Sequence, residues 1–227
     1  MTVSSDGLTS TIFLNGKTYT LPKKTDETAS YEWIGNTGYA YLVPLETSNP
    51  NAWIYWFAED TDGNSLGSGY ENFGGFIVGF ETDPATVSAQ TGTASLTGIA
   101  LGEYYVGSLR EAGRGSFVAN VDFDKGVVDG TLALSDLKPS NGIRLPEITL
   151  TFNAEENPNI AGNAFSSPKS DIQIEIESVV GEVSTVDDTA LSGKIYGPTS
   201  DTVAGSFWVE GMSNDHPMFI QGTFVTD

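Results

Sequence analysis

Short segments rich in Val, Ile, Thr, Phe and Tyr recur along the whole chain, and Gly, Asn, Asp or Pro separates each from the next. No window of a dozen residues keeps its apolar positions at the spacing of about 3.6 that an amphipathic helix requires. Short alternating segments bounded by turn residues are typical of antiparallel strands. The sequence therefore predicts an all-β fold, and 227 residues suffice for one large β domain or two smaller ones.

The second part of the chain contains a regular series of such segments. In residues 115–123, for example, Phe117, Ala119, Val121 and Phe123 alternate onto one face. Eight alternating strands connected by hairpins suit a closed antiparallel barrel filled by side chains. A ninth segment, 172–176, carries Glu175 and is expected as an excursion or an extra edge strand. The eight expected strands are 92–100, 115–123, 127–134, 147–153, 160–165, 190–196, 203–209 and 218–226.

The first part predicts a small antiparallel β subdomain. Residues 11–14 and 17–21 flank Asn15-Gly16, a pair that favours a type I′ hairpin turn. Pro22 is expected to end the second strand, because it has no N–H to donate. The composition changes near Asp83-Pro84, so we expect an aromatic-rich β subdomain over 1–84 and a barrel over 85–227. The other strands expected in the first part are 31–34, 38–43, 53–58 and 76–82.

The charge balance narrows the possible partners. The chain has 30 acidic and 10 basic side chains, a formal net charge of -20. Nucleic acids and anionic lipid surfaces are therefore excluded as expected partners, because both are bound through clustered Lys and Arg. Cationic partners and metal ions would be attracted, although a large charge also serves solubility alone.

The sequence lacks cysteine, a long apolar segment and an apolar signal core. The chain has no Cys, so it has neither a disulfide framework nor a thiolate metal site. It contains no run of 18 apolar residues, so we expect no membrane-spanning segment. Residues 1–7 lack an apolar signal core. Either the protein is not exported by a signal peptide, or its leader is not part of this chain.

Four motifs follow one another in the second part of the chain. They lie in residues 92–98 (Gly-Thr-Ala-Ser-Leu-Thr-Gly), 121–130 (Val-Asp-Phe with Gly126 and Gly130), 191–208 (with Tyr-Gly-Pro and Val-Ala-Gly) and 218–224 (Met-Phe-Ile-Gln-Gly-Thr-Phe). In this order they resemble the motifs of a known family, the transferrin-binding-protein-B-like surface proteins. The resemblance is to the barrel domain of that family and covers about residues 85–227. It implies a non-catalytic binding protein at the cell surface or outside the cell, serving nutrient-iron or haem acquisition or the capture of a host protein.

The aromatic residues of 53–57 are candidates for the binding surface. Trp53, Tyr55 and Phe57 alternate onto one face of the expected strand, and Trp56 lies on the other. Aromatic faces anchor protein partners, sugars and flat cofactors. The other interpretation is that these rings form the core of the first subdomain.

Two further motifs could bind a cofactor. His216, the single histidine, is expected in the loop before the last strand and could ligate haem iron, or it could be a solvated loop residue. The carboxylates and amide of Asp60, Asp62, Asn64 and Glu71 follow the spacing of a calcium loop. Ser65 stands at the sixth position, where such a loop requires Gly, so an acidic β-turn is the alternative.

No constellation of catalytic residues is evident. No Gly-x-Ser-x-Gly motif accompanies His216, and the adjacent pairs Glu155-Glu156 and Asp187-Asp188 point apart rather than toward one bond. We therefore predict a binding protein rather than an enzyme. The alternative is a structural or adhesive component of an extracellular assembly without a small ligand. A glycan hydrolase that uses loop carboxylates is the third hypothesis.

Overall fold

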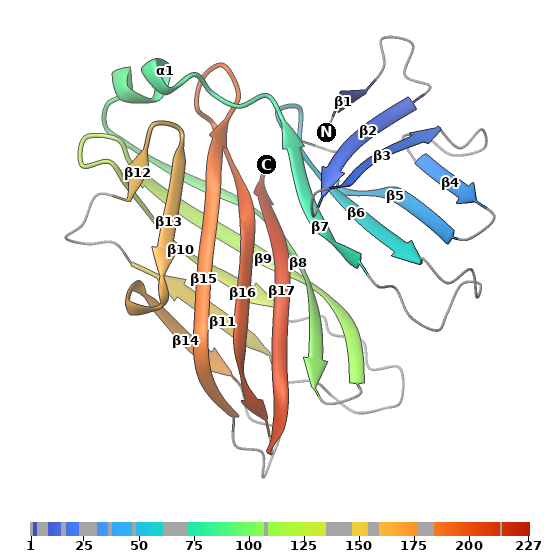
Figure 1. The fold of residues 1–227 in the computed structure, drawn as a ribbon. Coiled ribbons are helices and arrows are strands. Elements are labelled where there is room, and N and C mark those ends of the chain that lie inside the picture. The colour runs from blue at the N-terminus through green and yellow to red at the C-terminus, as the bar shows by residue number, and fades with distance from the viewer. Residues whose placement is uncertain are drawn as a thin grey trace. The chain divides into compact units, whose positions relative to one another are not determined.

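The computed structural model of the protein divides the chain into two compact units (Figure 1). The first unit comprises residues 1–47 and 53–78, and the second comprises 48–52 and 79–227. The residues described by the structure are 2–3, 9–14, 17–22, 31–35, 38–46, 49–60, 72–106, 109–134, 147–153, 159–176, 184–213 and 215–227.

The first unit contains two small antiparallel sheets. In the three-stranded sheet, β2 and β3 form the expected hairpin with Leu14 opposite Lys17, and Pro22 is the last residue of β3. The second sheet has four strands in chain order. The strands are β1 (Thr2–Val3), β2 (Thr9–Leu14), β3 (Lys17–Pro22), β4 (Tyr31–Gly35), β5 (Gly38–Glu46), β6 (Ala52–Asp60) and β7 (Asn72–Gly79).

The second unit is built on one ten-stranded antiparallel sheet, curled into a half-barrel (Figure 1). Its strand order is β12-β13-β15-β16-β17-β8-β9-β10-β11-β14. The strands are β8 (Thr93–Val106), β9 (Leu109–Asp122), β10 (Val127–Leu134), β11 (Ile148–Phe152), β12 (Ile160–Ala161), β13 (Ala164–Pro168), β14 (Ile172–Ile176), β15 (Ser184–Tyr196), β16 (Thr202–Ser213) and β17 (His216–Thr226).

The predicted all-β class is confirmed, and the strand count has a simple explanation. The segment expected as one strand at 160–165 folds as the short hairpin β12–β13. The segment 172–176 forms β14 at one end of the sheet, where it pairs with β11 alone. These two features turn eight expected strands into ten.

Two short helical segments connect the strands. Helix α1 (Pro84–Ala89) begins after Asp83, whose carboxylate accepts a hydrogen bond from the main-chain N–H of Ala85 at 2.8 Å. An acidic N-cap followed by Pro at the first turn is a favoured helix start. The 3₁₀ helix η1 (Lys169–Asp171) joins β13 to β14. Neither is long enough to cross a membrane, and the described residues include no other helix.

Alternation places the apolar side chains inside the half-barrel. Phe117 is fully buried, with its ring centroid 6.0 Å from that of Phe152 and 4.1 Å from that of Phe224. The expected inward face of residues 117–121 is confirmed, since Ala119 and Val121 are also buried. The other large, almost fully buried side chains of this unit are Tyr104, Phe207, Leu132, Leu134 and Ile148.

Candidate binding surfaces

The interior of the half-barrel is occupied by its own side chains. Phe117, Phe152, Phe207 and Phe224 are each at most 2% exposed and belong to one apolar cluster. A small ligand at this position would have to displace closely packed rings. The outer faces of the sheets and the connections between strands therefore remain as the candidate binding surfaces.

The aromatic segment of β6 lies in the first unit. Trp53 is half-buried, whereas Tyr55 is 8% exposed and its ring stacks on Phe76 of β7 with 6.1 Å between centroids. The main chain of Trp56 lies opposite Val43, and that of Phe57 lies opposite Leu42. The side chains of Trp56 and Phe57 lie outside the described part of the structure. Because Phe76 covers its ring, Tyr55 packs within the first unit and exposes little surface to a partner.

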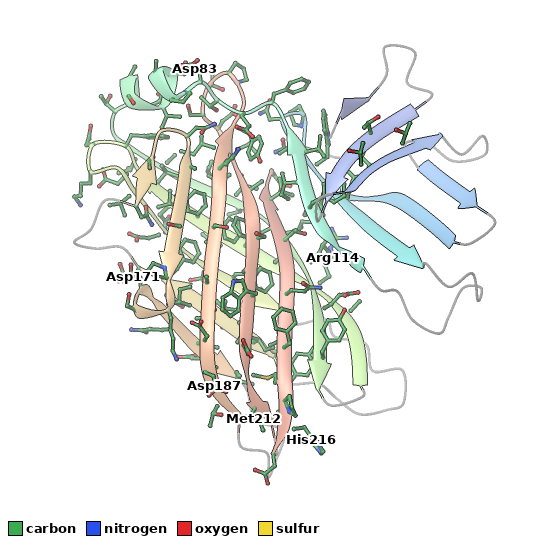
Figure 2. The ribbon with its side chains drawn as sticks, in the orientation of Figure 1. Asp83, Arg114, Asp171, Asp187, Met212 and His216 are labelled. Atoms are coloured by element: carbon green, nitrogen blue, oxygen red, sulfur yellow. The ribbon has the colours of Figure 1, made fainter. Side chains whose placement is uncertain are left out.

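The predicted cofactor residues lie at strand ends or outside the description. His216 is the exposed first residue of β17, opposite Ser213 in the hairpin with β16, at the end of the barrel that also carries Asp187 and Met212 (Figure 2). Asp60 is the last residue of β6. Asp62, Asn64 and Glu71 lie outside the described residues, so the calcium loop stays a prediction. Within the described residues, no three His, Asp or Glu side chains gather to hold a metal.

An exposed phenylalanine stands on the segment that follows β7. The main-chain N–H of Phe80 donates to the carbonyl of Asn51 at 2.8 Å, and its carbonyl accepts from the N–H of Gly197 at 2.8 Å. The Phe80 side chain is nevertheless 65% exposed. Its main chain is thus held on both sides while its ring faces solvent.

A charged and a phenolic side chain flank this segment. Lys194 lies 2.5 Å from the carboxylate of Glu81, and this hydrogen bond lowers the pKa of Glu81. Both partners are about half exposed, so the ion pair contributes little stability. Burial, followed by the negative charge of Glu81, raises the pKa of Tyr196 to about 12.

The outer face of the barrel carries aromatic residues that the sequence analysis did not select. Phe219 of β17 is 38% exposed and lies opposite Tyr105 of β8, with 6.3 Å between their ring centroids. On the neighbouring strand, Trp208 is half-buried. One signal was available, because Met218, Phe219 and Ile220 are consecutive apolar residues and alternation must turn one of them outward.

Comparisons with known proteins bear on the fold. No family model matches the chain, and no curated protein matches it. Among solved structures, transferrin-binding protein B from Haemophilus parasuis Hp5, a vaccine antigen, matches with a TM-score of 0.58 and 16% identity, covering 99% of this chain and 41% of that one. The intact Ap-TbpB structure, which has N and C lobes, matches with a TM-score of 0.56 and 17% identity, covering 99% of this chain and 43% of that one.

The chain thus spans about two-fifths of the length of these proteins. The resemblance noted in the motifs of residues 92–224 is confirmed in three dimensions, and the chain has the fold of a part of transferrin-binding protein B.

Proposed function

We propose that the chain is a non-catalytic binding protein at the cell surface or outside the cell, and that it captures a protein partner. The observation that carries this proposal is the likeness of 99% of the chain to transferrin-binding protein B. A net charge of -20 favours a partner with a positively charged surface, because complementary potentials speed encounter.

A protein partner fits this chain better than a ligand enclosed by the barrel. The described interior is filled by phenylalanine rings, so contacts must form on outer faces and loops. Protein interfaces draw most of their energy from a few aromatic anchors. We propose the exposed parts of Trp53, together with Trp56 and Phe57, as such anchors in the first unit.

Surface plasmon resonance with iron-free and iron-loaded transferrin tests the proposal. Binding should weaken about tenfold or more in Trp53→Ala or Trp56→Ala, and far less in the conservative variant Tyr55→Phe, which keeps the stack on Phe76. Absence of binding to transferrin and to an array of basic extracellular proteins would contradict protein capture. Equal losses in all three variants would indicate that the strand is core.

A haem or calcium ligand is tested in the same preparation. Native mass spectrometry before and after incubation with hemin should reveal a one-to-one adduct only if His216 supplies an axial ligand, and His216→Ala should then abolish it. A calcium adduct lost in Asp60→Ala would support the predicted loop at 60–71. We expect the protein-capture result to hold independently of either adduct.

The second candidate is a structural or adhesive component of an extracellular assembly. The filled interior favours it as much as it favours protein capture, since neither needs a ligand cavity. A single defined oligomeric mass, without binding to any partner, would support the assembly role and exclude the first proposal.

A further inference from the structure

One level of the outer barrel face combines aromatic and acidic side chains on four neighbouring strands. In β15, β16, β17 and β8, the residues opposite one another at this level are Asp188, Glu210, Phe219 and Tyr105. At the next level the corresponding residues are Ala190, Trp208, Gln221 and Glu103. We call these eight positions the outer patch.

The outer patch is unusually apolar for the solvent side of a sheet. An antiparallel sheet with one solvated face is expected to place polar residues there, yet Phe219 is 38% exposed and Trp208 is half-buried. Trp208 lies diagonal to Phe219, because it opposes Gln221 two residues along β17. Diagonal neighbours in a sheet are within reach of aromatic side chains, so Trp208 stands next to the ring pair of Phe219 and Tyr105, whose centroids are 6.3 Å apart.

The acidic side of the outer patch contains an unfavourable pair. Asp188 and Glu210 lie directly opposite each other, and both are exposed. Like charges in this position destabilise a sheet. In the described part of the chain neither carboxylate has an ion-pair partner.

One basic side chain, that of Lys169, binds the main chain of β15 next to this pair. The ammonium of Lys169 donates to main-chain carbonyls of β15, at Asp187 and, at 3.4 Å, at Val186. Local departures from stability rules cluster at functional sites.

We propose that the outer patch docks a segment of the partner protein that presents an apolar side chain beside Lys or Arg. The apolar side chain packs on Phe219, Trp208 and Tyr105, and the cation lies over the carboxylates of Asp188 and Glu210. Aromatic rings attract cations at their faces, and the cation removes the repulsion between the two acids. The proposal rests on the proposed function and specifies the chemistry of the partner.

Charge complementarity distinguishes this occupant from others. In a symmetric dimer the same patch would face itself, which would bring two acidic pairs together in copies that each carry a net charge of -20. An anionic lipid surface would be repelled in the same way. A basic segment is the occupant whose charge matches.

Peptide titration monitored by NMR tests the outer patch in the full chain. The probes are two peptides of equal length, one alternating Leu with Lys and one alternating Leu with Glu. The indole N–H signal of Trp208 is assigned from its absence in Trp208→Phe. We expect the Leu-Lys peptide to shift this signal and the Leu-Glu peptide to leave it unchanged. Affinity should fall about fivefold or more in Phe219→Ala and in Glu210→Gln.

Matched variants separate docking from general attraction. Phe80→Ala removes the other exposed phenylalanine, and Glu175→Gln removes one exposed charge from β14; both should bind within about twofold of the parent. An equal loss in Glu175→Gln, or no shift of the Trp208 signal, overturns the proposal. So does a dimer that disappears in Phe219→Ala, because the occupant would then be a second copy. A protein partner that binds Phe219→Ala with the affinity of the parent would overturn the role of the outer patch in docking, while the proposed function would remain.

Discussion

The rings of Phe117 and Phe224 stack across the barrel interior with 4.1 Å between their centroids and 24° between their planes. The two residues belong to β9 and β17, which are not neighbours in the sheet because β8 lies between them. The contact therefore depends on the curl of the sheet, and it reports on the packing of the interior rather than on one strand pair.

Replacing Phe117 by Ala should destabilise the barrel strongly. A buried Phe→Ala change removes transfer free energy and leaves a cavity, at a cost of about 3–5 kcal/mol. The free energy of unfolding measured with urea gives this cost, and Phe219→Ala on the outer face serves as the control with a loss of less than about 1 kcal/mol. Equal costs for the two variants would contradict the interior position of Phe117.

Gly205 should not tolerate a side chain. A Cβ at this position would lie 2.7 Å from the Phe224 ring and would also meet the main-chain carbonyl of Ser192. Overpacking of this kind costs about 1–3 kcal/mol or more. We expect Gly205→Ala to lower the unfolding free energy by that amount in urea denaturation, while Ser206→Ala on the adjacent exposed position stays near the parent. A neutral Gly205→Ala would disprove the close approach.

Asn49 should contribute more to stability than a loop asparagine usually does. It is 3% exposed, its amide donates to the carbonyl of Thr226 at 2.6 Å, and its side-chain oxygen accepts from the N–H groups of Asn51 and Ala52. Asn49→Ala leaves these buried groups without partners, at a cost of about 1–3 kcal/mol. Thermal unfolding measures the loss, and the less buried Asn163→Ala provides the comparison. Similar melting temperatures for the two variants would refute this role.

The raised pKa of Tyr196 predicts a loss of stability at high pH. The pKa of the Tyr196 hydroxyl is about 10 in the unfolded chain and about 12 in the folded protein. Stability from this group is present below the unfolded value and is lost as the pH rises from about 10 to about 12. The loss approaches about 2–3 kcal/mol. Denaturation of the parent and Tyr196→Phe across this range should give diverging curves, and parallel curves would rule out the shift.

Removing one charge of the opposed acidic pair should stabilise the fold. Glu210→Gln relieves repulsion with Asp188 and should raise the unfolding free energy by a few tenths of a kcal/mol at low salt, with the gain shrinking in high salt. Glu175→Gln, which has no carboxylate opposite it, is the control; its register partner is Thr149. A destabilised Glu210→Gln would show that the carboxylate has a structural partner.

Alternation of apolar residues predicted most of the sheet but not its partners or its strand lengths. The strands β8 and β9 run to Val106 and from Leu109, beyond the segments 92–100 and 115–123. The strands are longer than predicted because main-chain hydrogen bonds, and not side-chain polarity, define their ends. Exposed charged residues such as Arg114 therefore fit within them. The pairing of Phe224 with Ala100 joins strands more than a hundred residues apart, and a local pattern contains no information on such pairs.

The outer patch was harder to foresee than the barrel. Three consecutive apolar residues at 218–220 are also typical of strands buried on both faces. The exposure of Phe219 in the structure shows that one face of this strand is open to solvent. The Asp188–Glu210 pair depends on a register shift in β15 between Val186 and Asp188. Without that shift a one-residue slip would exchange the faces, and the Asp187-Asp188 pair in the sequence does not by itself specify a shift within a continuous strand.

The placement of residues 48–52 in the second unit has a consequence for how the barrel can be divided. Asn49 binds groups on both of the last two strands, yet residues 53–78 of the other unit lie between it and Gly79 in the sequence. A fragment that begins at residue 79 would therefore lack a piece of its own framework. We expect such a fragment to gain stability when a short peptide spanning 46–54 is added in trans, so the barrel is a candidate for fragment complementation rather than for excision by a single cut.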